Sequence, residues 1–231
     1  MTPAPTIAFD LDGTLIDSAP DLHAAANRML SEAGPGAGRV RLDQVRGFIG
    51  NGIPMLVLRT MRAAGLGEDP DTHRHLTKVF SDHYAADPVA LTTLYPGVRA
   101  ALDALVASGC RLTICTNKPR APALAVLRAF DLSDLFDTVI GGDSLPTRKP
   151  DPQMLHAALD PSPRGGAVFV GDSEVDAKTA QRAKVPFLLF TGGYRRGEIN
   201  AMSLAATFDN HDQLATLAHS LFGADGRPST I

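Results

Sequence analysis

Two carboxylates stand two positions apart where a short apolar segment ends. Residues 6–9 are apolar and β-prone, and Asp10 and Asp12 follow them directly, just before Gly13. Such a run, bounded by a glycine, predicts a buried strand. Like charges at a strand end cost free energy unless a cation lies between them or one carboxylate keeps its proton. The pattern therefore points to chemistry, with Asp10 as a nucleophile, Asp12 as a general acid and base, and a hard divalent cation beside Asp10.

A plain Asp-rich turn is the alternative interpretation of this segment. Asp, Gly and Thr are ordinary turn residues, and the Thr14 hydroxyl can hold such a turn without any catalytic role. The chemical interpretation is favoured only if other parts of the chain bring suitable partners to the same place.

The elements that must position these residues follow from the hydrophobic pattern. After Asp17 the period changes to about 3.6 residues, and four helical segments are expected in succession, within residues 18–33, 42–48, 53–64 and 71–86. From Tyr95 onward helices alternate with expected strands at residues 111–115, 138–140, 167–170 and 185–190. This alternation predicts an α/β fold with a Rossmann-like parallel sheet covered by helices on both faces. We expect a core domain from residues 1–17 and 88–231 and an inserted α-helical cap domain from residues 18–87.

Polar side chains follow the other expected strands as well. Ligands of open α/β sheets bind beyond the carboxyl ends of the strands, so these side chains should converge on one crevice. The Thr116 hydroxyl, the amide of Asn117 and the ammonium of Lys149 could hold phosphoryl oxygens, and Asp172 could complete a Mg²⁺ site with Asp10. Taken singly, each has a structural explanation as a helix cap, a solvated lysine or a first-turn acid.

The strand-end residues, in their order along the chain, resemble the four motifs of the haloacid dehalogenase superfamily of phosphohydrolases. The helical insert is similar to the mobile cap of that superfamily. The resemblance implies that Asp10 attacks phosphorus to form an aspartyl phosphate, and that Asp12 protonates the leaving alkoxide and then deprotonates the hydrolytic water. It implies that Mg²⁺ is bound by Asp10, the backbone carbonyl of Asp12 and Asp172, and that Lys149 bridges Asp10 and the phosphoryl oxygens. Asp176, one helical turn after Asp172, is expected to orient a metal-bound water or Lys149.

Three segments, residues 48–52, 114–119 and 141–152, look more narrowly like the phosphoglycolate phosphatase family of bacteria. That resemblance implies a small phosphorylated metabolite, 2-phosphoglycolate, as the substrate. In the cap, amides near Asn51 and Gly52, where a helix is expected to begin, could bind the substrate carboxylate, with Arg46 nearby. A plain turn between two helices is the alternative there. Two alternatives remain open: the same mechanism on another small phosphate, namely a sugar phosphate, an amino-sugar phosphate or pyrophosphate, and phosphotransfer like that of a β-phosphoglucomutase.

Composition and charge narrow the remaining classes of function. The net charge is −3 and the pI about 6.1, so no basic face predicts binding to nucleic acid or to an anionic membrane. The sequence has no apolar run near 18 residues and no leader pattern, and we expect a cytoplasmic monomer or homodimer. A non-catalytic phosphate-binding protein is disfavoured because Asp12, Lys149 and Asp172 are all present. The loop at residues 192–196, with its two arginines, is expected to be a solvated basic turn, and contact with the cap or a substrate is the alternative.

Overall fold

A computed structural model describes residues 4–34, 36–159 and 166–222 of the chain. In these residues six parallel strands form one sheet in the order β5-β4-β1-β6-β7-β8. The strands are β1 (Thr6–Phe9), β4 (Arg111–Cys115), β5 (Thr138–Ile140), β6 (Ala167–Gly171), β7 (Phe187–Phe190) and β8 (Ala206–Phe208). The α/β fold with a parallel sheet, predicted from the alternation of elements, is confirmed.

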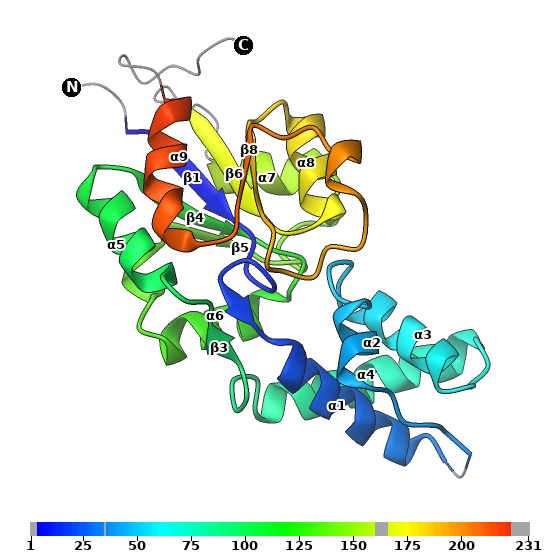
Figure 1. Cartoon of the computed structure of the whole chain (residues 1–231). Helices are drawn as coiled ribbons and strands as arrows, with labels where there is room; N and C mark the ends of the chain where they lie inside the picture. The colour runs from blue at the N-terminus through cyan, green and yellow to red at the C-terminus, as the bar shows by residue number, and fades with distance from the viewer. Residues whose placement is uncertain (1–3, 35, 160–165, 223–231) are drawn as a thin grey trace.

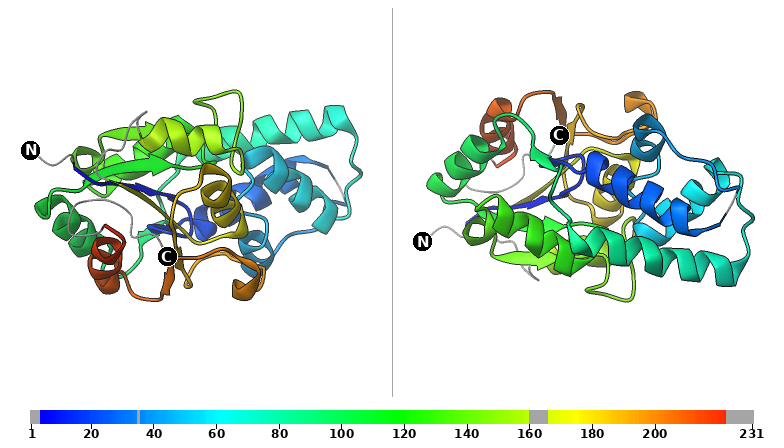
Figure 2. Two further views of the ribbon diagram at one scale, coloured as in Figure 1. Left: turned by 90° about the horizontal axis from the view of Figure 1, so that it is seen from above. Right: turned by 90° about the horizontal axis from the view of Figure 1, so that it is seen from below.

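The central strand β1 is buried on both faces, as its unbroken apolar sequence predicts. Because side chains alternate along a strand, Ile7 and Phe9 join one hydrophobic cluster and Ala8 joins another. On the first face the cluster includes side chains of α5 (Val98–Ala107), α6 (Arg120–Ala129) and α9 (Leu214–Leu221). On the second face it includes those of α7 (Pro152–Leu159) and α8 (Glu174–Ala183). Figures 1 and 2 show these helices on both sides of the sheet.

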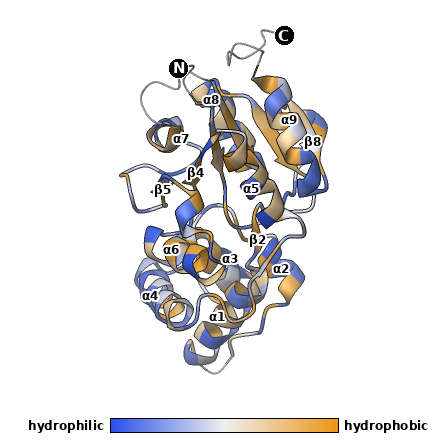
Figure 3. Ribbon diagram, turned by 90° about the vertical axis from the view of Figure 1, so that its left-hand side faces the viewer, coloured by the Kyte–Doolittle hydropathy of each residue, from blue (hydrophilic) through white to orange (hydrophobic). Residues whose placement is uncertain are grey.

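Four helices between β1 and the rest of the sheet form a separate group. They are α1 (Ala19–Glu32), α2 (Leu42–Arg46), α3 (Ile53–Ala63) and α4 (Pro70–Ala86). These helices share a hydrophobic cluster of their own, in which Met29, Met61 and Phe80 are fully buried. Figures 1 and 3 show the group beyond the end of the sheet at which β1 finishes. Helices in this position can cover whatever lies at the carboxyl ends of the strands.

A short antiparallel pair of strands, absent from the sequence-based prediction, connects the helical group to the sheet. Strand β2 (Ile16–Asp17) pairs with β3 (Thr93–Leu94), so the two places where the chain passes between core and helices lie together. The outermost strand, β8, was not predicted either. A two-residue strand is too short to show a hydrophobic period. Residues 223–231, for which the sequence predicts a polar tail, lie outside the described residues.

No helix in the described part of the chain is both long enough and apolar enough to cross a membrane.

Candidate active site

The loop after β1 presents Asp10 at the end of the sheet. The Asp10 backbone N–H donates to Val170 O at 2.9 Å, which extends the pairing with β6 by one residue. The chain then turns so sharply that the amides of Leu15 and Ile16 both donate to Leu11 O. Gly13 has a φ of +91°, and a Cβ built on it would lie 2.4 Å from Asp172 Oδ2. Only glycine lets this loop pass so close to Asp172.

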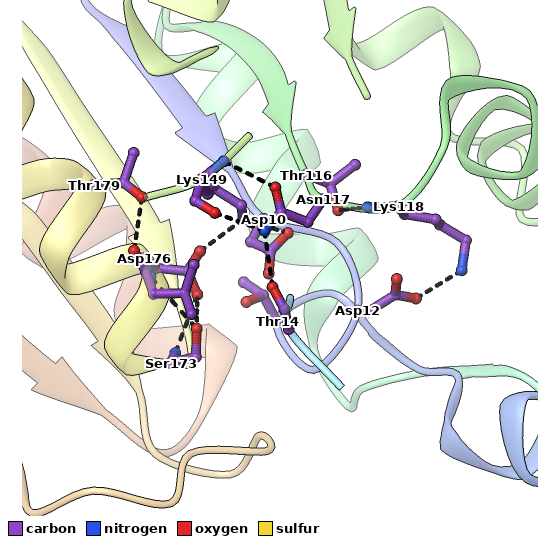
Figure 4. A network of polar contacts seen from close by, with 12 residues as sticks. Asp10, Asp12, Thr14, Thr116, Asn117, Lys118, Lys149, Ser173, Asp176 and Thr179 are labelled. Carbon is purple, nitrogen blue, oxygen red and sulfur yellow. Dashed lines mark hydrogen bonds and ion pairs between the residues drawn. The ribbon is translucent and has the colours of Figure 1, made fainter. Parts of the chain in front are cut away.

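Asp10 lies in a network of buried charges (Figure 4). The Lys149 Nζ atom is 2.8 Å from Asp10 Oδ1 and 2.6 Å from Asp176 Oδ1. Burial raises the pKa of Asp10 to about 6, although Lys149 opposes the shift. Burial also acts to lower the pKa of Lys149, but the carboxylates of Asp10 and Asp176 outweigh it and raise that pKa. Lys149 is therefore held as a cation between two carboxylates.

The Asp176 carboxylate is fixed by the start of its own helix. Its Oδ2 accepts hydrogen bonds from the backbone and hydroxyl of Ser173, at 3.1 and 2.6 Å, and so completes a capping box at the start of α8. Its Oδ1 is left to pair with Lys149. This arrangement matches a residue that orients Lys149, which is one of the two roles expected for Asp176.

Three carboxylates in this network could hold a metal ion. Asp10, Asp172 and Asp176 are buried, and one oxygen from each lies within 4.8 Å of the others. Asp172 accepts from the Thr14 hydroxyl at 3.1 Å and from the Tyr194 backbone N–H at 2.6 Å. Burial, with the charges of Asp176 and Asp10, raises the pKa of Asp172 well above its usual value.

A hard divalent cation fits this donor set. The cluster contains three carboxylates, of which only Asp10 and Asp176 pair with an ammonium, that of Lys149, among the described residues. Oxygen donors of this kind are the ligands that Mg²⁺ prefers. The expected set of Asp10, Asp172 and the Asp12 carbonyl shares its two carboxylates with this cluster, and Asp176 adds a third nearby.

Asp12 lies in a different environment from Asp10. Its Oδ1 accepts from the Ser18 hydroxyl at 2.6 Å and from Lys118 Nζ at 2.8 Å, while Lys118 also donates to the hydroxyl of Tyr84 on α4. Figure 4 shows the Asp12–Lys118 pair on the opposite side of Asp10 from Asp176. Sequence reasoning did not select Lys118 or Tyr84. The position of Lys118 at a strand end was a signal for the first, but nothing in the sequence linked Tyr84 to it.

Thr116 and Asn117 follow β4 next to Asp10. Thr116 is almost fully buried, and its hydroxyl accepts from the Lys118 backbone N–H at 3.2 Å. The Asn117 side chain donates to Gly50 O at 2.9 Å and to Lys149 O at 3.1 Å, and it accepts from the Lys149 N–H at 2.9 Å. Because both of its side-chain N–H groups are engaged, this amide ties the Lys149 loop to the cap.

A cavity separates these residues from the cap helices. Its core wall includes Asp10, Asp12, Thr116, Asn117 and Lys118, and its cap wall is formed by residues of α1, α3, α4 and the loop before α3, namely Leu22, Ile49, Gly50, Gly52, Ile53, Leu56 and Tyr84. The cap side is mostly apolar and the core side is polar. Such a cavity suits a small ligand whose charged end faces the core.

The predicted cap residues are only partly at this cavity. Gly52 lines it as the residue before α3. Arg46 instead pairs with Asp17 at 2.6 Å at a partly exposed site, and the side-chain Oδ1 of Asn51 accepts from Arg59 at 2.9 Å. In this arrangement Arg46 connects α2 to Asp17 of β2, and Asn51 holds Arg59 of α3.

The loop after β7 was expected to be a solvated turn, and for Tyr194 that expectation is wrong. Its side chain is 8% exposed. Its hydroxyl donates to Asp17 Oδ1 at 2.7 Å and accepts from the backbone N–H groups of Ser18 and Ala19. Because the Tyr194 N–H also contacts Asp172, one residue joins the acidic cluster to the start of α1. The two glycines before Tyr194 and its aromatic side chain were the only features of the sequence that could have indicated its burial.

The family assignment follows from comparison with known proteins. A model of the haloacid dehalogenase-like hydrolases matches residues 7–190, a span that includes all of the predicted site residues. The chain belongs to the haloacid dehalogenase-like hydrolase family. This hydrolase is 48% identical over 219 residues to a phosphoglycolate phosphatase of Cereibacter sphaeroides (strain ATCC 17025 / ATH 2.4.3), covering 94% of this chain and 99% of the relative. It is 46% identical over 214 residues to a phosphoglycolate phosphatase of Rhodobacter capsulatus, covering 91% and 95% of the two chains.

A solved structure extends the similarity to three dimensions. The hydrolase superposes on the crystal structure of a predicted phosphoglycolate phosphatase from Haemophilus somnus 129PT with a TM-score of 0.84 and 30% identity. The superposition covers 94% of this chain and 99% of the other. The similarity therefore includes the helical group as well as the sheet.

Proposed function

We propose that this hydrolase is a Mg²⁺-dependent phosphomonoesterase that converts 2-phosphoglycolate to glycolate and phosphate. The observation that carries the proposal is that the two aspartates of one loop have different neighbours. Asp10 lies against Lys149 and the acidic cluster, whereas Asp12 is turned toward the cavity and held by Ser18 and Lys118. The relatives in Cereibacter and Rhodobacter, similar over nearly their whole length, support the choice of substrate.

In the first half of the proposed reaction, an oxygen of Asp10 attacks phosphorus and the bond to the glycolate oxygen breaks. Asp12 gives its proton to that leaving oxygen. The product is an aspartyl phosphate at Asp10 with glycolate released. In the second half, Asp12 takes a proton from a water molecule that attacks the phosphorus, so that phosphate leaves and Asp10 is regenerated.

The other core residues stabilise the charge that spreads over the phosphoryl oxygens. We assign the Thr116 hydroxyl, the Asn117 backbone N–H and the Lys149 ammonium to these oxygens. Bound Mg²⁺, held by Asp10, Asp172 and the Asp12 carbonyl, would supply further positive charge there. Asp176 keeps Lys149 in position through their 2.6 Å ion pair.

We propose that residues 18–87 act as a cap over this site. Closure of the cap helices would exclude water while the phosphoryl group is transferred. The backbone at Gly52, which precedes α3 and lines the cavity, could meet the carboxylate end of the substrate. Asn51 would act there indirectly, by holding the loop before α3 through Arg59. Arg46 would act by holding the junction between β2 and α1 through Asp17.

The test is phosphate release with Mg²⁺ from 2-phosphoglycolate, pyrophosphate, sugar and amino-sugar phosphates and β-glucose 1-phosphate, compared by kcat/KM. The Asp10→Asn variant serves as the blank because it lacks the attacking carboxylate. We expect 2-phosphoglycolate to be preferred and the variant to be inactive on every compound. Efficient turnover of another phosphate with 2-phosphoglycolate ignored would refute the substrate, and activity in Asp10→Asn would refute the mechanism.

A further inference from the structure

Lys118 is a buried cation on the cavity wall that the proposed reaction leaves without a direct task. Only 2% of its side chain is exposed. Its ammonium is 2.8 Å from Asp12 Oδ1, donates to the Tyr84 hydroxyl and lies 4.8 Å from the centre of the Tyr84 ring. Among the described residues that line the cavity, it supplies the cationic side chain, whereas Lys149 lies deeper, behind Asp10 and against Asp176. Burying an ammonium costs free energy unless its charge is paired with an anionic side chain or ligand.

The position of this ammonium matches the part of the substrate that is not phosphate. Asp12 must lie beside the ester oxygen to protonate it, and the Lys118 ammonium is in direct contact with Asp12. In 2-phosphoglycolate a single methylene joins that ester oxygen to the carboxylate. A carboxylate so close to the scissile bond therefore falls within reach of Lys118.

The ammonium also has the donor and the charge that such a contact needs. Of its three N–H groups, one is directed to Asp12 and one to Tyr84, which leaves a third for a ligand. The contacts with Asp12 and Tyr84 fix the ammonium at the cavity wall. Leu22, Ile53 and Leu56 make the cap wall beside it apolar, and a charge-assisted hydrogen bond is stronger in apolar surroundings than in water.

We propose that Lys118 binds the substrate's carboxylate and so makes the enzyme selective for short phosphoesters that carry one. This inference rests on the proposed phosphatase activity and adds the residue that chooses the substrate. Tyr84, on cap helix α4, completes the contact by fixing the ammonium from the cap side. The selecting group thus comes from the core loop, and the cap side chain only positions it.

The test compares 2-phosphoglycolate with ethyl phosphate, which keeps the two-carbon ester and lacks the carboxylate. Values of kcat and KM are measured with Mg²⁺ for the wild type and for Lys118→Met, Lys118→Arg and Tyr84→Phe. Lys178→Met, which changes an exposed lysine on α8, is the matched control. Circular dichroism and the Tm of each variant verify that it is folded.

We expect Lys118→Met to lower kcat/KM for 2-phosphoglycolate by roughly 100-fold, mainly through KM, because loss of one partner of a buried charge pair is expensive. The value for ethyl phosphate should fall by about 10-fold or less, through the altered surroundings of Asp12. Lys118→Arg should keep part of the preference, Tyr84→Phe should reduce it while leaving the charge in place, and Lys178→Met should change neither substrate.

An equal fall for both substrates would mean that Lys118 only positions Asp12, and it would overturn the inference while the phosphatase proposal survives. An unchanged preference in Lys118→Met would overturn it as well. If Lys118→Met does not fold, the preference measured in Tyr84→Phe decides between the same outcomes. A wild-type enzyme that shows no preference for 2-phosphoglycolate over ethyl phosphate would refute both the proposed substrate and the role of Lys118.

Discussion

At the scale of single residues, two identical side chains of the site lie in different surroundings. Asp10 and Asp12 are separated by one residue, and strand alternation alone would place both side chains on the same face. Strand β1 ends at Phe9, however, and the turn that follows it gives the two carboxylates different neighbours. Asp10 meets Lys149 and the acidic cluster, and Asp12 meets Ser18 and Lys118. In the proposed reaction Asp10 must be ionised to attack phosphorus, and Asp12 must exchange a proton with the leaving oxygen, so the two carboxylates need different neighbours.

The acidic cluster leads to a prediction about metal binding that needs no activity assay. Saturating Mg²⁺ should stabilise the wild type, by about 2.7 kcal/mol at a concentration of 100 times the Kd. Asp172→Asn should lose this stabilisation, because one of three buried carboxylates is removed. Without metal the variant should be at least as stable as the wild type, because repulsion from Asp10 and Asp176 is relieved. The measurement is thermal unfolding with a chelator and with Mg²⁺.

The control for this experiment is Asp134→Asn, which changes an exposed carboxylate far along the chain from the cluster. It should keep the full increase in Tm on addition of Mg²⁺. An Asp172→Asn protein that gains as much stability from Mg²⁺ as the wild type would show that the ion binds elsewhere.

The sequence could indicate the core residues of the site because they follow predicted strands. Asp10, Thr116, Lys149 and Asp172 each stand just after a strand or in the loop it leads to, and parallel topology brings such positions together. The Lys118–Tyr84 contact could not be found in this way. Tyr84 is 34 residues from Lys118 and lies on a helix, so its contact depends on how the cap is placed on the core. Hydrophobic periodicity does not contain that information.

At the scale of elements, the loop after β7 connects the acidic cluster to the start of α1. Tyr194 contacts Asp172 through its backbone and the start of α1 through its hydroxyl. Arg196, two residues later, donates to Gly47 O at the end of α2. The sequence also failed to predict the β2–β3 pair, because two-residue strands have no detectable hydrophobic period. The longer helices were predicted nearly residue for residue. Both omissions concern the junction between core and cap.

Tyr194→Phe tests whether this connection supports catalysis. The change leaves the buried N–H groups of Ser18 and Ala19 without their hydroxyl acceptor, at an expected cost of about 1–3 kcal/mol in the free energy of unfolding. Because the Ser18 side chain holds Asp12, kcat should fall for 2-phosphoglycolate and ethyl phosphate alike. Urea unfolding and steady-state kinetics measure the two effects. Lower stability with an unchanged kcat would limit Tyr194 to a structural link.

At the scale of the whole molecule, buried apolar side chains form separate clusters in the core and in the cap. The two clusters of the core lie on either face of the sheet, and the third lies among α1, α2, α3 and α4. Elements that share few apolar contacts can open independently, with a free energy below that of global unfolding. Two chain crossings and the polar contacts around Asn117 and Tyr84 connect the cap cluster to the core. We therefore propose that the cap, residues 18–87, is a separate folding unit.

Hydrogen exchange on two matched variants tests that independence. Phe80 in the cap cluster and Phe169 in the sheet are both fully buried, and truncation of either to alanine should cost about 3–5 kcal/mol. If the cap is a separate unit, Phe80→Ala should speed amide exchange in α1, α3 and α4 and leave β1, β4 and β6 nearly as protected as in the wild type. Phe169→Ala should weaken protection of the sheet, and of the cap through it, because the cap is anchored on the loops that follow the strands. If Phe80→Ala lowers protection equally in the cap and in the sheet, the molecule opens as one unit. The cap would then have to move over the active site as a rigid body, with its own hydrophobic cluster intact.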